Sequence, residues 1–161
     1  MLRSLKGHII YAMTTKKYLL LLVDRQHAKL FIIADGRIIE EKKVEKDNVP
    51  QNVKHGDDTW DAQDKIFRHI EQHLHRHLHH VAVEATTFIK EKNVTGILIG
   101  GHKPLFAKVE SHLQYPFSKK VFGTFVTELK VPNNIILHKA LQELEKIETK
   151  KEDDRLQQAL H

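Results

Sequence analysis

The residues with the greatest chemical potential are six histidines between positions 69 and 80, which are accompanied by Arg68 and Arg76. If this segment is helical, four of these histidines fall within an arc of about 80°. Those four are His69, His73, His77 and His80. Such a face has three interpretations: a solvated, partly protonated surface, a surface that contacts phosphates or RNA, or a metal site.

The metal interpretation would use His69, His73 and His77, in which neighbouring members are four residues apart. That spacing allows two imidazoles to share an ion. The sequence contains no His-Glu-x-x-His motif of a zinc hydrolase, and it contains no cysteine. We therefore predict no metal and no other cofactor, and these three histidines stay weak candidates.

Asp24 follows an apolar segment at residues 18–23 and would stand at the end of a strand. A nuclease that uses two metal ions needs several carboxylates that converge on those ions. The later apolar segment at residues 94–99 is followed by two glycines and supplies no acid. The sequence therefore predicts that Asp24 is a turn residue and that the chain is not a nuclease.

The sequence Gly100-Gly101-His102-Lys103-Pro104 combines two glycines with a lysine ahead of a predicted helix. Crevices at the carboxyl ends of strands often hold ligands in α/β sheets, and backbone N–H groups there can bind phosphate. The same glycines would also serve a tight turn. The pattern matches neither a P-loop nor a dinucleotide-binding motif, so both interpretations stay open.

The composition describes a basic chain of 161 residues with 26 Lys and Arg, 21 Asp and Glu, and a net charge of +5. This length suits one domain with short appendages. The charge weakly favours polyanionic partners such as nucleic acid or the ribosome. The longest apolar run, residues 18–23, is too short to span a membrane, so we expect a cytoplasmic protein.

The order of the predicted elements indicates an α/β domain at residues 17–147, between an N-terminal arm at 1–16 and a charged C-terminal tail at 148–161. Three strands that form an antiparallel meander are followed by alternating helices and strands. Right-handed crossovers would place the later strands beside the first one. The result is a ribonuclease H-like, five-stranded mixed sheet with helices on both faces. The expected strands are 18–23, 28–34, 37–44, 94–99 and 121–127, and the expected helices are 61–92, 105–114 and 135–147.

The longest predicted loop, residues 45–60, is polar and ends in Trp60, the only tryptophan of the chain. An aromatic side chain in such a loop could stack on a base. It could equally pack the loop against the start of the following helix. Both roles stay open.

Several features together resemble the middle domain of the archaeo-eukaryotic peptide-chain release factors and Pelota, and most of all the bacterial archaeo-eukaryotic release factor families. The resemblance covers residues 17–147 and implies the same ribonuclease H-like fold. The features are LLVDRQHAKLF at 21–31, the Asp35-Gly36 hairpin, VKHG at 53–56 before a long basic helix, and GILIGG at 96–101.

In release factors, the loop before the long helix carries a Gly-Gly-Gln tripeptide that helps water attack the peptidyl-tRNA ester. The preceding Lys-His-Gly matches Lys54, His55 and Gly56, but the tripeptide is missing here. Gln63 is the glutamine nearest to the expected place. By resemblance, Gln63 would orient water while Lys54 and His55 hold phosphates. Without the two glycines, we expect peptidyl-tRNA hydrolysis to be weak or absent.

The resemblance also implies that the long helix faces RNA, with the ribosome or tRNA as partner. The corresponding RNA-binding residues are Lys54, His55, Trp60, Lys65, Arg68 and Arg76. Two other functions stay open from the residues alone. One is a non-catalytic protein-interaction domain that uses the sheet edge or the last helix, and the other is a histidine-rich metal-binding domain. The sequence does not determine the oligomeric state.

Overall fold

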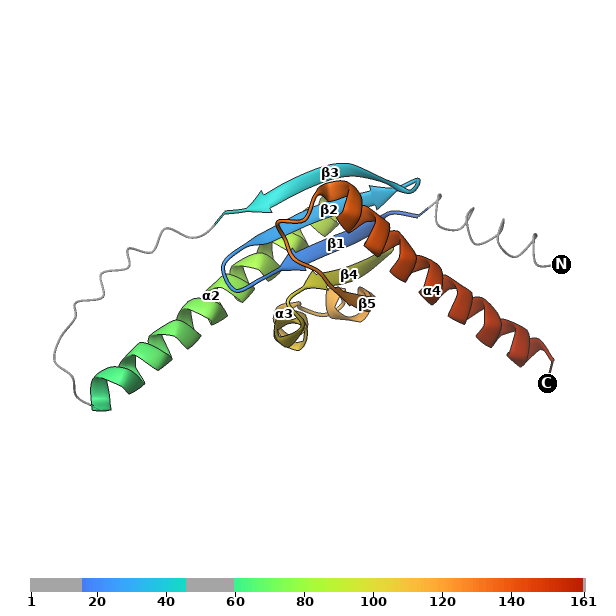
Figure 1. The fold of residues 1–161 in the computed structure, drawn as a ribbon. Helices are drawn as coiled ribbons and strands as arrows, with labels where there is room; N and C mark the ends of the chain where they lie inside the picture. Colours follow the sequence, from blue (N-terminus) through green and yellow to red (C-terminus); the bar gives the residue numbers. More distant parts are fainter. Residues whose placement is uncertain (1–15, 46–59, 161) are drawn as a thin grey trace.

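The computed structural model describes residues 16–45 and 60–160, and of Trp60 and Asp61 only the backbone. A five-stranded mixed sheet with the order β3-β2-β1-β4-β5 forms the centre (Figure 1). The elements are β1 (Tyr18–Val23), β2 (Ala28–Ala34), β3 (Arg37–Val44), α2 (Trp60–Lys92), β4 (Gly96–Gly101), the 3-10 turn η1 (Lys103–Leu105), α3 (Phe106–His112), the 3-10 turn η2 (Phe117–Lys120), β5 (Val121–Val126) and α4 (Asn133–Ala159).

The first three strands form the predicted antiparallel meander. The turn between β2 and β3 consists of Asp35 and Gly36, whose φ angles are 55° and 68°. Positive φ at both central positions is what a two-residue hairpin requires, because the twist of that turn matches the twist of the strands. The prediction of a hairpin at this dipeptide is therefore confirmed.

The later strands extend the sheet on the other side of β1. β4 pairs in parallel with β1, and β5 pairs in parallel with β4. This arrangement confirms the predicted mixed sheet and its ribonuclease H-like order. It makes β1 the central strand, and all six of its residues are buried. β1 therefore contributes apolar side chains to the layers on both faces of the sheet.

Two hydrophobic cores lie on opposite faces of the sheet. Leu19 and Leu21 of β1 join the core that α2 and α3 cover. Leu20 and Leu22 point the other way, into the core that α4 covers with Ile136. Alternating residues of a strand point to opposite faces, so a wholly apolar strand needs helices on both sides. Helices on both faces were predicted, and the structure has them.

The two long helices extend past the sheet. α2 projects beyond it at its N-terminal end and α4 at its C-terminal end (Figure 1). α4 continues to Ala159, so it includes most of the residues predicted as a charged tail. None of the helices that the structure describes is long and apolar enough to cross a bilayer.

Candidate nucleic-acid interface

α2 has two halves with different surroundings. In the packed half, residues 77–92, an apolar stripe lies on the sheet, and Leu78 and Val81 are 1% and 0% exposed. The same stripe continues into the projecting half, residues 62–76, where Leu74 still packs against the core but Phe67 is 72% and Ile70 is 53% exposed. Both were predicted to belong to the apolar face, but the described part of the chain leaves them largely uncovered.

The projecting half carries a basic face opposite this stripe. Lys65, Arg68 and Arg76 are all exposed. At about 100° per residue, the three share an arc of about 80°. Within residues 16–45 and 60–160, none of the three forms a salt bridge. Basic side chains that have no salt-bridge partner and share one face of a helix suit phosphate groups that are spaced along a nucleic acid.

The other predicted site residues are placed less completely. Lys54 and His55 lie outside the described residues, and the side chain of Trp60 is also outside them. Gln63 is exposed on the first turn of α2. Counting about 100° per residue, Gln63 lies on the side of the helix opposite to the basic face. The structure therefore brings three of the predicted RNA contacts together and separates the candidate catalytic residue from them.

His77 marks the boundary between the two halves of α2. Its Nε2 atom donates a hydrogen bond of 3.0 Å to the carbonyl oxygen of Asp24. Burial lowers the pKa of His77, and the hydrogen bond only partly opposes that effect. This contact joins α2 to the turn after β1.

The Asp24 side chain belongs to the same turn. Its carboxylate accepts a hydrogen bond from the backbone N–H of Gln26 at 2.8 Å, which confirms the prediction that Asp24 is a turn residue.

The remaining histidines form two groups. His69 and His73 pack edge to face with ring centroids 4.9 Å apart. On the other side of the helix, His75 and His79 lie 4.6 and 6.0 Å from the ring of His112, at the end of α3. Burial, followed by the charges of His75 and His79, lowers the pKa of His112. This second group could not be predicted from the sequence, because His112 belongs to another element.

The weak metal candidates do not form a common site, because the Nε2 atom of His77 is used by Asp24 while His69 and His73 pack on each other. In the described ranges, no group of three or more histidine, aspartate and glutamate side chains is arranged to hold a metal ion. The geometry of α2 therefore favours the phosphate-contacting and solvated interpretations of its histidines.

A comparison with known protein families shows to which family the whole chain belongs. A model of bacterial archaeo-eukaryotic release factor family 10 matches residues 11–145, which is most of the chain. The chain belongs to this family. Family 10 membership confirms the resemblance on which the interpretation of α2 as an RNA-facing helix rests.

Solved structures agree with the fold of this family 10 chain. An archaeal translation termination factor, aRF1, is similar over 97% of the chain and 44% of its own length, with 15% identity and a TM-score of 0.55. Pelota from Archaeoglobus fulgidus is similar over 96% of the chain and 40% of its own length, with 9% identity and a TM-score of 0.50. The chain thus spans less than half the length of each. No curated protein matches it.

Two glycines of the family 10 chain have a structural role at the end of β4. Gly101 has a φ of +119°, and a Cβ atom there would lie 2.2 Å from the carbonyl oxygen of Val23. A Cβ on Gly100 would collide with Leu22 and Phe125. The geometry favours the interpretation that these glycines allow a tight turn and close packing.

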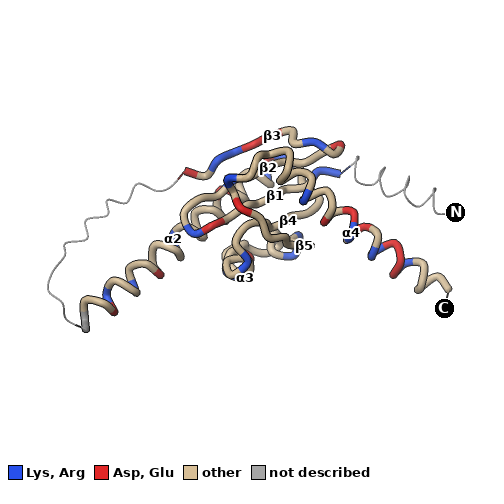
Figure 2. Tube along the Cα trace, viewed as in Figure 1, with Lys and Arg blue, Asp and Glu red and all other residues tan. Residues whose placement is uncertain are grey.

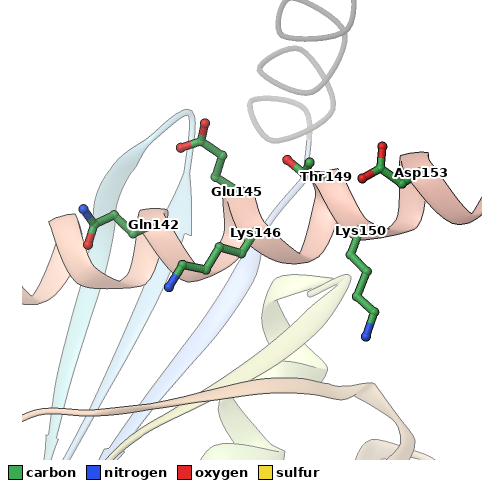
Figure 3. Close-up of a pocket in the computed structure, with 6 residues that line it drawn as sticks. All are labelled: Gln142, Glu145, Lys146, Thr149, Lys150 and Asp153. Carbon is green, nitrogen blue, oxygen red and sulfur yellow. The ribbon is translucent and has the colours of Figure 1, made fainter.

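A shallow depression on α4 is a poor candidate for a binding site. All of its lining residues come from one helix, and Figure 3 shows Lys146 and Lys150 pointing away from Glu145, Thr149 and Asp153. Side chains that diverge in this way do not surround a ligand. The lining residues are Gln142, Glu145, Lys146, Thr149, Lys150 and Asp153.

Proposed function

We propose that this chain is a release-factor-like domain of a bacterial translation or ribosome-rescue factor, and that it binds ribosomal RNA or tRNA through the projecting half of α2. The observation that carries the proposal is the exposed basic face formed by Lys65, Arg68 and Arg76. Family membership supports a role in translation. The site of action would be the cytoplasm, where ribosomes are found.

The shape of α2 suits this role. The projecting half extends beyond the sheet, so RNA could approach it without meeting the body of the domain (Figures 1 and 2). Asp64 and Glu71, which are also exposed, lie between the apolar stripe and the basic face, and both line a depression on α2 together with Arg68. Phosphates would therefore compete with these two acids for Arg68, whereas Arg76 has no acid three or four residues away.

We further propose that peptidyl-tRNA hydrolysis is weak or absent. Gln63 is the only candidate for orienting water, and its place on α2 is opposite to the basic face. The two glycines that let a release-factor backbone approach the ester are missing before it. If hydrolysis does occur, Lys54 and His55 would hold phosphates while Gln63 orients the water.

The binding proposal is tested by co-sedimentation with purified bacterial ribosomes, and by tRNA binding, over a series of salt concentrations. Lys65→Gln/Arg68→Gln/Arg76→Gln should weaken binding and flatten the salt dependence by about one unit of slope per lost phosphate contact. The matched control Lys90→Gln/Lys130→Gln/Lys150→Gln removes three exposed charges elsewhere. It should leave most of the slope intact.

Equal losses in the two triple variants would show that only net charge matters and would contradict the proposed face. No binding by the parent chain at low salt would eliminate the proposal. Hydrolysis is tested separately by release of a labelled peptide from stalled ribosomes. We expect release no faster than in buffer, and an activity that disappears in Gln63→Ala would contradict the second proposal.

A further inference from the structure

The two edges of the sheet differ in how they are protected. β3 carries five charged residues, which are arginine, glutamate and lysine, and Figure 2 shows blue and red segments along it. Charged side chains on an edge strand discourage pairing with another chain. β5, at the opposite edge, has the sequence VFGTFV and contains no charge. Among the residues that the structure describes, no strand pairs with the outer edge of β5, so this edge is open to a further strand.

The backbone of β5 is oriented to accept such a strand. The N–H of Thr127 donates to the carbonyl oxygen of Gly101 in β4 at 3.2 Å, so it faces inward. Backbone groups alternate in direction along a strand, so those of Val126 and Thr124 face outward. Both residues are exposed, and Val126 is 62% exposed. The bulge of β5 lies before Gly123 and does not interrupt this alternation.

A pocket of about 360 Å³ lies beside these outward-facing groups. Its lining includes Thr124 and Val126 of β5, with Lys103 from one face of the sheet and Lys139 of α4 from the other. The only carboxylate in the lining is Glu143, and it is paired with Lys146 at 3.4 Å. In the part of the chain that the structure describes, neither Lys103 nor Lys139 has a carboxylate partner.

We propose that β5 binds an extended acidic peptide of a partner protein as a sixth strand, with its carboxylates beside Lys103 on one face of the sheet or Lys139 on the other. In strand addition, main-chain hydrogen bonds supply affinity, and pockets for alternate side chains supply specificity. The outward N–H and C=O groups at Thr124 and Val126 provide the first requirement. The lysine-flanked pocket provides the second, and it selects a negative side chain.

A second copy of this chain fits the edge less well. Antiparallel pairing of two β5 strands about a two-fold axis would bring the start of each strand against the end of the other. The exposed Lys119 stands just before β5, while Lys103 and Lys139 flank its C-terminal part. Lys119 of each copy would then approach Lys103 and Lys139 of the other, which is unfavourable, and Glu128, exposed two residues after β5, offers only one opposite charge there. An acidic peptide reverses the sign of that interaction.

The test uses the whole chain, labelled with ¹⁵N, and a blocked seven-residue peptide of alternating valine and glutamate. We expect saturable shifts of the Thr124 and Val126 amide signals. A peptide of alternating valine and lysine should bind more weakly. The valine–glutamate peptide N-methylated at every amide keeps its side chains but loses its N–H donors, and its methyl groups would collide with the edge of β5, so it should not bind.

Two protein variants and two controls locate the contact. Thr124→Pro removes an outward N–H and should abolish binding, whereas Thr124→Val retains that N–H and should bind like the parent. Lys103→Gln/Lys139→Gln should weaken binding of the acidic peptide about fivefold and remove the preference over the lysine peptide. The basic-face variant Lys65→Gln/Arg68→Gln/Arg76→Gln should bind the peptide normally, so this proposal fails or holds independently of RNA binding.

Three results would overturn the proposal. The first is the absence of saturable shifts at Thr124 and Val126 with the glutamate peptide. The second is equal binding of the N-methylated or lysine peptide. The third is a dimer of the parent chain in sedimentation that Thr124→Pro dissociates, because the edge would then pair with a second copy.

Discussion

The two halves of α2 share one helix and one apolar stripe, but they have different environments. The packed half covers the sheet with Leu78 and Val81, while Phe67 and Ile70 of the projecting half stay exposed. The helix extends past the sheet at its N-terminal end, where no other described element covers it (Figure 1). The comparison teaches that an amphipathic period predicts which face of a helix is apolar, but not how far that face is buried.

The two halves also use their charged and polar side chains differently. Lys42 and Glu84 form an ion pair between β3 and the packed half, and Lys92 pairs with Glu40 at 2.8 Å. The basic residues of the projecting half have no such partner among the described residues. Charges in one half therefore join parts of the domain, and charges in the other are available to a ligand.

The largest expected difference between the halves is in stability. Leu78→Ala should lower the free energy of unfolding by about 2–5 kcal/mol, because it leaves a cavity in a closed core. Phe67→Ala removes a larger side chain from the same stripe but should change that free energy by less than about 0.5 kcal/mol. Urea unfolding followed by circular dichroism measures both. A similar loss in the two variants would mean that the projecting half is also covered in solution.

A second, smaller difference between the two halves is expected in how much their histidines make the free energy of unfolding depend on pH. Burial lowers the pKa of His77 and of His112 below the ordinary histidine value of about 6.5. Between the folded and unfolded pKa values, the unfolded chain binds more protons. The associated stability is therefore complete above about pH 6.5 and is lost as the pH falls through that window.

His77→Gln/His112→Gln should reduce this acid-dependent loss, as measured by urea unfolding between pH 7.5 and 5. Glutamine at position 77 can still donate to the Asp24 carbonyl group. The matched variant His69→Gln/His73→Gln changes two imidazoles of the projecting half and should show the same acid-dependent loss as the parent chain. If this second variant alone removed the loss, the assignment of acid sensitivity to the packed contacts would be wrong.

The smallest expected effect concerns the ion pair between Lys92 and Glu40. Their side chains are 29% and 42% exposed, so water screens the attraction. A double-mutant cycle with Lys92→Gln and Glu40→Gln should give a coupling of about 0.2–1 kcal/mol that decreases as salt is added. A coupling well above this range, or one insensitive to salt, would show that the pair contributes more to holding α2 on the sheet than its exposure indicates.

Most of the fold could be predicted because its signals are local. The apolar run at Tyr18–Val23, the Asp35-Gly36 turn and the absence of glycine and proline across α2 each determine one element. Handedness then leaves few ways to join the elements into a sheet. The candidate site was only partly predictable, because contacts such as those between His112 and the α2 histidines join residues that are distant in the sequence.

The amino-acid sequence alone determined the elements and their order. It also determined the basic residues on the long helix, which resemble those of the release factors. Periodicity and turn chemistry act over a few neighbouring residues, so they can be read without a structure. Only the tertiary structure decided that Phe67 is exposed, that His77 bonds to Asp24, and that β5 ends the sheet beside two lysines. Burial and edge position depend on which elements meet in space and where each of them ends.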